Sequence, residues 1–225
     1  MESQEDPFFE LRLYRVEPGR ISDLERRMQE DLRVLFPRHG IRPAGTWSVR
    51  VGAQSPLFVY LMPWRNMQQR TNALAGFVAD PDWAQARART NAGTELVERY
   101  EILFLRAIRD WQPAPLTTGA ADAVVELLLQ EVAQGQGGEV RRAIMETALP
   151  AWEEVGATVC GVFDIMSGYG LPAVAFVVAW PSIERQAAAS EAVREKLGKL
   201  RAGTGVPLLQ RTDARLMRPV HVKWA

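Results

Sequence analysis

The stretch that decides the fold is FFELRLYRV, residues 8–16, because it returns 116 positions later as VVELLLQEV, residues 124–132. Glu10 and the two leucines after it recur as identical residues. The same offset relates residues farther along both halves, and these pairs are Gly40 and Gly156, Gly45 and Gly161, Gly52 and Gly168, Pro56 and Pro172, Trp64 and Trp180. A single repeat longer than a solenoid unit indicates a duplicated domain.

Each half predicts the same order of elements. In the first half, strict alternation at 8–16 predicts a half-buried strand. Ser22 with Glu25 forms a capping-box pattern that predicts the start of a helix, and His39-Gly40 predicts its end. Strands at 45–51 and 57–63, a helix at 65–79, a short helix after Asp80-Pro81 and a strand at 97–108 follow. The second half predicts strands at 123–132, 158–165, 173–180 and 208–218 and helices at 137–152 and 182–199.

This β-α-β-β-α-β order is the ferredoxin-like pattern, so the predicted fold class is α+β with two fused ferredoxin-like domains. We expect an N-terminal domain at 1–110, a linker at 111–121 and a C-terminal repeat at 122–225. Residues 173–180 are apolar on both faces, which predicts burial of both faces of the sheet. Packing the two sheets together would form a pseudo-dimeric α+β barrel. Both a monomer containing this internal pseudo-dimer and a homodimer stay open.

Composition narrows the function. The 225 residues carry 27 basic and 27 acidic side chains, so we expect no nucleic-acid partner. No run approaches the roughly 18 apolar residues of a membrane span, and the N-terminus lacks a signal pattern, so a cytoplasmic location is expected. Two histidines and a single cysteine cannot form a common structural zinc site. No phosphate-binding or dinucleotide motif is present, and we predict no cofactor and no metal.

The halves differ in their polar side chains, which places the candidate site. Arg12, Tyr14, His39 and Tyr60 correspond to Leu128, Gln130, Val155 and Phe176. After duplication one copy can keep a site while the other becomes scaffold. We therefore predict a small-molecule pocket between the sheet and the helices of the first half. The predicted catalytic residues are Arg12, Tyr14, His39, Tyr60 and Glu10.

Each candidate also has a structural interpretation. Glu10 beside Arg12 could orient a substrate or move a proton, but its recurrence as Glu126 favours a buried ion pair. Tyr14 and Tyr60 could donate to an oxyanion or be core aromatics. His39 could be a base or a haem ligand, although a cationic residue at a helix end also favours the helix dipole.

Four further residues are predicted to bind the substrate. Trp47 and Trp83 could stack against a flat substrate, and Phe58 and Arg106 complete the set. Trp83 lies in a segment that the second half lacks, which makes it a candidate lid residue. Arg106 recurs as Arg218, so it is also a candidate structural partner of the repeated glutamates.

Several motifs occur together in the first half. The segments 9–14 (FELRLY), 38–41 (RHGI), 45–47 (GTW) and 79–83 (ADPDW) resemble the NIPSNAP family, within the dimeric α+β barrel superfamily. The resemblance covers most of residues 8–108 and implies paired ferredoxin-like domains that form a barrel.

The superfamily includes cofactor-free monooxygenases, haem enzymes, isomerases, dehydratases and cyclases. The resemblance itself implies little about function. The polar groups kept in the aromatic-rich first half lead us to expect a cofactor-independent enzyme acting on a hydrophobic or aromatic metabolite, as in bacterial secondary metabolism, by oxygenation, isomerisation, dehydration or cyclisation. The alternative, suggested by animal members with mitochondrial and vesicular roles, is a non-catalytic ligand-binding or adaptor protein. Haem bound through His39 is a third expectation.

Overall fold

The computed structural model describes residues 7–112 and 123–225. Most of the predicted linker, residues 113–121, lies outside the described residues. The described chain divides into two compact units. The first contains the residues up to Arg50, Gln54–Phe104 and Pro219–Ala225. The second contains Val51–Ala53 and the described part of Leu105–Arg218.

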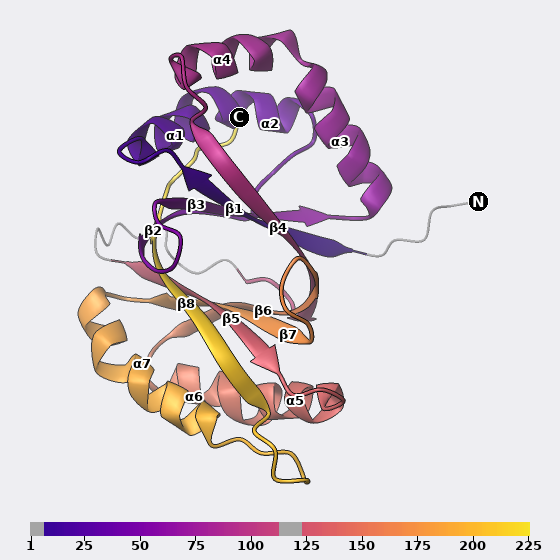
Figure 1. Cartoon of the computed structure of the whole chain (residues 1–225), viewed down its shortest axis with the longest axis vertical. Coiled ribbons are helices and arrows are strands. Elements are labelled where there is room, and N and C mark those ends of the chain that lie inside the picture. Colours follow the sequence, from indigo (N-terminus) through magenta and orange to yellow (C-terminus); the bar gives the residue numbers. More distant parts are fainter. Residues whose placement is uncertain (1–6, 113–122) are drawn as a thin grey trace. The chain divides into compact units, whose positions relative to one another are not determined.

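The first unit follows the predicted order of elements (Figure 1). Its strands are β1 (Phe8–Val16), β2 (Gly45–Val51), β3 (Leu57–Trp64) and β4 (Val97–Arg109), of which the part up to Phe104 belongs to this unit. Its helices are α1 (Ile21–Arg27), the π-helix η1 (Met28–Leu32), α2 (Arg33–Arg38), α3 (Met67–Ala79) and α4 (Pro81–Asn91). The strand order is β4-β1-β3-β2, and β3 runs antiparallel to both β1 and β2.

The second unit repeats this arrangement. Its strands are β5 (Val124–Val132), β6 (Thr158–Ser167), β7 (Ala173–Trp180) and β8 (Leu209–Pro219), and its helices are α5 (Gly137–Ala143), the π-helix η2 (Ile144–Ala148), α6 (Leu149–Glu154) and α7 (Ile183–Gly198). The strand order is β8-β5-β7-β6, with β7 antiparallel to β5 and β6. The protein is therefore a mixed α/β fold built on antiparallel strands.

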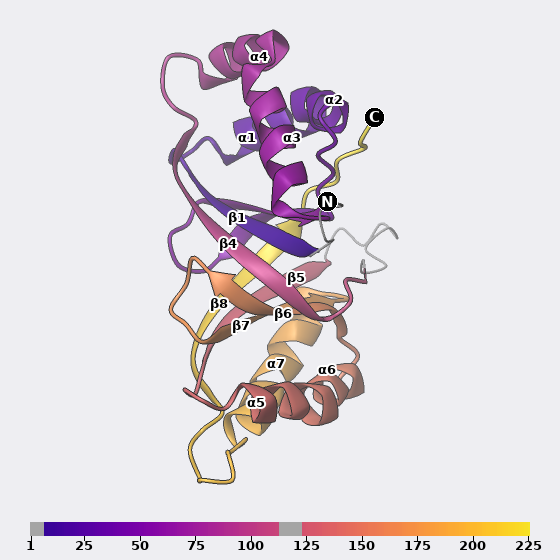
Figure 2. The ribbon, with the colours of Figure 1, turned by 90° about the vertical axis from the view of Figure 1, so that its right-hand side faces the viewer.

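In each unit the helices cover one face of the strands, as Figures 1 and 2 show for α1–α4 and for α5–α7. Alternation in β1 gives Glu10, Arg12 and Tyr14 one face and Leu11 and Leu13 the other. The polar set of β1 consequently faces the helices of its own unit, where Arg70 of α3 bonds to Glu10.

The first helix begins differently from the prediction. Ser22 does not cap it: α1 begins at Ile21, Arg20 occupies the N-cap position, and no side chain caps the backbone there. The end is confirmed, with Gly40 in the left-handed region at φ 71°. Two π-helical segments, η1 and η2, were not predicted because apolar spacing of three to four residues does not distinguish a π-helix from an α-helix. Their positions again differ by 116 residues.

The turn between α3 and α4 agrees with the sequence prediction. The Asp80 side chain accepts a hydrogen bond from the Asp82 backbone N–H at 2.9 Å, and Pro81 occupies the first helical position. Asn66 caps α3 in the same way through the Gln69 N–H. These caps fix where the α3 and α4 side chains meet the sheet.

The core of the second unit is filled by apolar side chains where the first unit is polar. Leu128 and Phe176, the counterparts of Arg12 and Tyr60, are buried in one hydrophobic cluster with Trp152. The Trp152 and Trp180 rings meet edge to face with centroids 5.6 Å apart. The second unit therefore has no polar side chain at the positions of Arg12 and Tyr60, and a polar ligand site there is possible only in the first unit.

Candidate functional site

A cavity of about 170 Å³ lies within the first unit, between the β1–β3 face and the helices. Most of its wall is aromatic or aliphatic. Its polar groups come from three arginines, three tyrosines and one glutamate. The lining residues are Arg12, Tyr14, Leu24, Arg27, Met28, Leu32, Phe36, Phe58, Tyr60, Met62, Leu74, Phe77, Trp83, Arg87, Glu95, Val97 and Tyr100. Apolar walls with a few convergent polar groups are typical of a small-molecule site.

The strand register brings the main polar cluster together. Arg12 and Tyr14 share a face of β1, and antiparallel pairing sets Tyr60 of β3 opposite Arg12. The Arg12 Nη1 donates to the Tyr14 hydroxyl at 2.9 Å and, at 3.4 Å, to that of Tyr60. The two tyrosine rings meet edge to face with centroids 5.1 Å apart. A guanidinium and two hydroxyls thus converge on one wall of the cavity.

Glu10 holds Arg12 from behind. This carboxylate has no exposed surface and accepts hydrogen bonds from Arg12 Nε at 2.8 Å, Arg70 Nε at 2.7 Å, Arg70 Nη2 at 2.9 Å and Trp64 Nε1 at 2.9 Å. Burial acts to raise the pKa of Glu10, but the hydrogen bonds and charges of Arg70 and Arg12 outweigh it and lower the pKa. Glu10 is therefore ionised and positions Arg12; it is a poor proton acceptor.

The pKa of Glu126, the counterpart of Glu10 in the second unit, is shifted in the opposite direction. Glu126 keeps the Trp180 Nε1 bond at 3.1 Å, but one of its carboxylate oxygens has no hydrogen-bond partner. Its nearest cation, Arg194, lies 3.9 Å away. Burial raises the pKa of Glu126, and Arg194 and Trp180 offset this only in part. The two copies of one glutamate are thus held in different charge environments.

The tyrosines remain available as donors. Burial, with the neighbouring Tyr14, raises the pKa of Tyr60 well above its usual value. Burial opposes the charge on Arg12, but Tyr60, Tyr14 and Glu10 raise its pKa above the usual value. Tyr60 therefore keeps its proton and Arg12 keeps its charge at neutral pH. This arrangement can bind an oxygen atom that carries negative charge.

Aromatic rings form the rest of the wall. Phe36 packs edge to face on Phe77 at 5.0 Å between centroids, and Phe77 lies 4.7 Å from Trp83. Tyr100 of β4 lies 5.5 Å from Tyr14. Rings in several orientations around a small volume favour a flat apolar ligand.

The structure brings five of the nine predicted site residues to the cavity: Arg12, Tyr14, Phe58, Tyr60 and Trp83. Glu10 does not line the cavity, but it accepts a hydrogen bond from Arg12, which does. Trp47 is buried on β2, where its indole fills the space over Gly45, and it does not line the cavity. Arg106 is exposed on the part of β4 that groups with the second unit.

His39 is also outside the cavity lining. Its Nε2 lies 2.7 Å from Asp80 Oδ2, and its ring packs near Phe77 and against Gly76 of α3. The hydrogen bond from His39, with the Asp82 N–H and Arg38, lowers the pKa of Asp80 against the effect of burial. His39 thus braces the turn between α3 and α4, and this placement does not fit a haem ligand in the cavity.

Sequence reasoning missed several lining residues. Arg27 lies three residues after Leu24 on the buried stripe of α1, and this spacing is the signal that could have identified it. Arg70, the second partner of Glu10, shares a face with Ala73 and Phe77. Phe36 and Phe77 also line the cavity and were not among the predicted site residues.

Two other hollows lie in the second unit along its loops. Their volumes are about 530 and 370 Å³, and they are lined mainly by residues 131–136, 170–173 and 206–210. Both are open to solvent and lack an aromatic wall. Among the described residues, no group of three or more histidine, cysteine or acidic side chains could hold a metal ion, and no helix is long and apolar enough to cross a membrane.

Together, the sheet, its helices and the aromatic cavity define a mixed α/β protein with a small-molecule-sized cavity in its first unit. The sequence model of the NIPSNAP family matches residues 9–110. The resemblance predicted from the sequence is confirmed over that segment. No curated protein sequence matches the chain.

Two solved structures that align with nearly the whole chain share the fold, and a third aligns with less than half of it. A protein from Lactobacillus acidophilus NCFM described as a "putative monooxygenase" has 11% identity and a TM-score of 0.58, over 96% of this chain and 95% of its own. An anthrone oxidase-like protein has 12% identity and a TM-score of 0.54, over 97% of this chain and 93% of its own. A NIPSNAP domain protein from Burkholderia xenovorans has 23% identity and a TM-score of 0.38, over 44% of this chain and 92% of its own.

Proposed function

We propose that the first unit is a cofactor-independent enzyme that binds a small aromatic or hydrophobic compound and stabilises an enolate or phenolate oxygen formed on it. One observation carries the proposal: Arg12 donates to both Tyr14 and Tyr60 at the wall of an apolar cavity while Glu10 fixes Arg12 from behind. Donors that are held in place before the charge develops stabilise it without reorganisation.

The ionised state of Glu10 defines the chemistry further. Because Arg12 and Arg70 keep this carboxylate charged, Glu10 positions the Arg12 guanidinium and does not accept the substrate's proton. The substrate must then have an acidic C–H or O–H bond whose proton leaves to water. A carbonyl or hydroxyl conjugated with an aromatic ring has this property, and the aromatic wall suits it.

Cavity size limits the ligand. A cavity of roughly 150 Å³ in another protein accepts benzene, whereas drug-sized ligands occupy roughly 300–1,000 Å³. The volume of about 170 Å³ therefore favours a compound with one ring or two small fused rings.

Among the reactions open to an enolate, we favour oxygenation. Two proteins with the same fold are described as a "putative monooxygenase" and as anthrone oxidase-like. In such a step an enolate carbon gives electrons to O₂, a C–O bond forms, and the CH₂ group becomes a carbonyl. The other oxygen atom leaves as water with the two hydrogens, so no external reductant is required.

The same proposal includes the finer architecture and setting. We infer that the two units are ferredoxin-like copies from a tandem duplication, which form an internal pseudo-dimer in a cytoplasmic enzyme. The repeated element order and the matched positions of η1 and η2 support it. Sedimentation of the purified chain as a folded monomer would agree with the internal pseudo-dimer, and a chain that folds only as a homodimer would contradict it.

Hydrogen–deuterium exchange of 2-indanone, followed by NMR in D₂O, tests the chemistry. We expect the protein to accelerate exchange at the carbons beside the carbonyl, with O₂ consumption in air. Tyr60→Phe should slow exchange about 10²-fold, the usual cost of losing one oxyanion donor. Binding without exchange would support the non-catalytic alternative, and neither binding nor exchange would refute the proposed site.

A further inference from the structure

The cavity contains a second cation that the proposed chemistry does not use. Arg27 of α1 lines the cavity and is only 4% exposed. Its Nε donates to Thr90 Oγ1 at 2.7 Å and its Nη2 to Asn91 Oδ1 at 2.6 Å. Both partners are neutral, and its Nη1 takes part in neither bond.

Four other arginines of the first unit are different, because each has a carboxylate within 3.1 Å. These pairs are Arg12 with Glu10, Arg20 with Glu17 and Asp23, Arg87 with Glu95, and Arg89 with Asp31. Asp31 and Glu95 attract Arg27 without bonding to it, because Asp31 Oδ1 bonds to Arg89 and Glu95 bonds to Arg87 and Asn91. Among the described residues, Arg27 is thus a buried guanidinium with no ion-pair partner.

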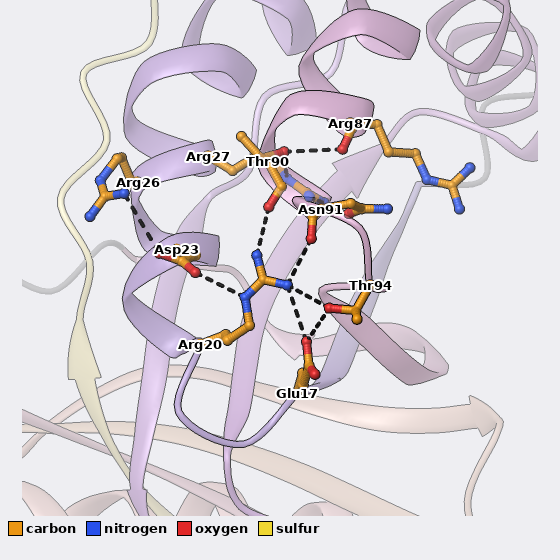
Figure 3. Close-up of polar contacts among 9 residues, drawn as sticks. All are labelled: Glu17, Arg20, Asp23, Arg26, Arg27, Arg87, Thr90, Asn91 and Thr94. Atoms are coloured by element: carbon orange, nitrogen blue, oxygen red, sulfur yellow. Dashed lines mark hydrogen bonds and ion pairs between the residues drawn. The ribbon is translucent and has the colours of Figure 1, made fainter.

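Figure 3 shows the contacts of Arg20 where α1 meets the end of α4, with Arg27 beside Thr90 and Asn91. Arg20 donates to the Thr90 and Asn91 carbonyls at 2.9 and 2.8 Å, which ties the end of α4 to the start of α1. Thr90 Oγ1 donates in turn to the Ala86 carbonyl at 2.6 Å. With Trp83 5.6 Å from the guanidinium, Arg27 is fixed before any ligand arrives.

A buried charge without a partner is costly unless something else supplies the opposite charge. The counterpart of Arg27 in the second unit is Ala143. Thr90 and Asn91 belong to α4, and the second unit has no second helix there. The complete arrangement is therefore confined to the unit that has the cavity.

We infer that Arg27 binds a carboxylate of the ligand, so that the substrate class is a small aromatic acid. This inference rests on the proposed function, because the same ligand would present its phenol or enolate oxygen to Arg12, Tyr14 and Tyr60. A guanidinium with a free edge suits a planar carboxylate, which accepts charge-assisted hydrogen bonds. A purely structural role, pinning α1 to α4, is the competing explanation.

Two probes of the same shape separate these roles: 4-hydroxybenzoate and its neutral analogue 4-hydroxybenzamide, both measured by isothermal titration calorimetry on the full chain. We expect the wild-type protein to bind the carboxylate at least about tenfold more tightly. Arg27→Met should reduce this preference to within about twofold while affinity for the amide stays unchanged. Arg27→Lys should restore part of the preference.

Two control variants complete the experiment. Arg20→Met breaks the ties to α4 and should lower stability while leaving the carboxylate preference intact. Arg12→Leu should weaken both probes equally and keep the preference. Equal affinity of the wild-type protein for the two probes, with both weakened by Arg12→Leu, would overturn the role of Arg27 and leave the proposed function standing. Equal losses for both probes in Arg27→Met would show a structural role, and no binding of either probe would overturn both proposals.

Discussion

The two copies of the repeated glutamate give the sharpest prediction, because the same substitution should have different effects in each. Glu10 accepts three charge-assisted hydrogen bonds from two arginines and one from Trp64. Glu10→Gln would leave the side chains of Arg12 and Arg70 without their anion. Their exposures are only 12% and 18%, so water can replace it only in part.

Removing one member of a buried ion pair costs about 3–5 kcal/mol. Because both arginines keep some contact with water, we expect the lower end, about 3 kcal/mol, for Glu10→Gln. Glu126→Gln keeps an acceptor for Trp180 and removes a carboxylate whose pKa is raised, so the cost should stay below about 1 kcal/mol. For a chain of this size, 3 kcal/mol corresponds to a fall in melting temperature of roughly 6–12 °C.

The pH dependence should also have opposite signs. The lowered pKa of Glu10 means that its contribution to stability is present above pH 4.5, its unfolded value, and is lost as the pH falls through the folded value. The raised pKa of Glu126 means that its contribution is present below pH 4.5 and is lost as the pH rises through the folded value.

Urea unfolding of the wild-type protein and both variants between pH 3 and pH 8, followed by circular dichroism, measures these differences. The gap between wild-type and Glu10→Gln should stay constant above about pH 5 and narrow as the pH falls below 4.5. The Glu126→Gln variant should improve relative to wild-type as the pH rises above 4.5. Equal losses in the two variants, or a larger loss in Glu126→Gln, would refute the reasoning about their partners.

Three further predictions follow from the contacts. Tyr60→Phe should weaken binding of 4-nitrophenolate about tenfold while leaving nitrobenzene binding unchanged, as measured by absorbance titration; a parallel loss for both ligands would point to altered packing. Gly45→Ala should destabilise the first unit by about 1–3 kcal/mol, because a Cβ there would lie 2.1 Å from the Trp47 ring; a melting temperature equal to that of wild-type would contradict this. Because burial lowers the pKa of Arg27 to about 10, preference for 4-hydroxybenzoate over the amide should persist at pH 8 and decline above pH 10, and a decline near pH 7 would implicate another group.

Much of the fold could be predicted because local patterns and the repeat agree. Alternation in FFELRLYRV gives β1, and the Asp80-Pro81 turn gives the break before α4. Ser22 was misread because a capping pattern states only which side chain could cap. In the structure the N-cap is Arg20, two residues earlier.

The site was predicted in part for a similar reason. Arg12, Tyr14 and Tyr60 could be found because they differ from their counterparts in the second half, which are Leu128, Gln130 and Phe176. His39 was grouped with them by the same comparison, but its partner Asp80 lies 41 residues away and draws it to the α3–α4 turn. Arg27 and Arg70 act through contacts between distant elements, and a sequence pattern does not contain those distances.

The most direct test of the account converts the first unit to the residues of the second. The variant Arg12→Leu/Tyr14→Gln/Tyr60→Phe replaces the polar cluster by its own counterparts, which the same fold accommodates. Calorimetric titration with 4-nitrophenolate should show binding to the wild-type protein and at least about 100-fold weaker binding to the variant, with far-UV circular dichroism unchanged. A variant that stays folded and binds the phenolate as tightly as the wild-type protein would contradict the claim that this cluster is the ligand site.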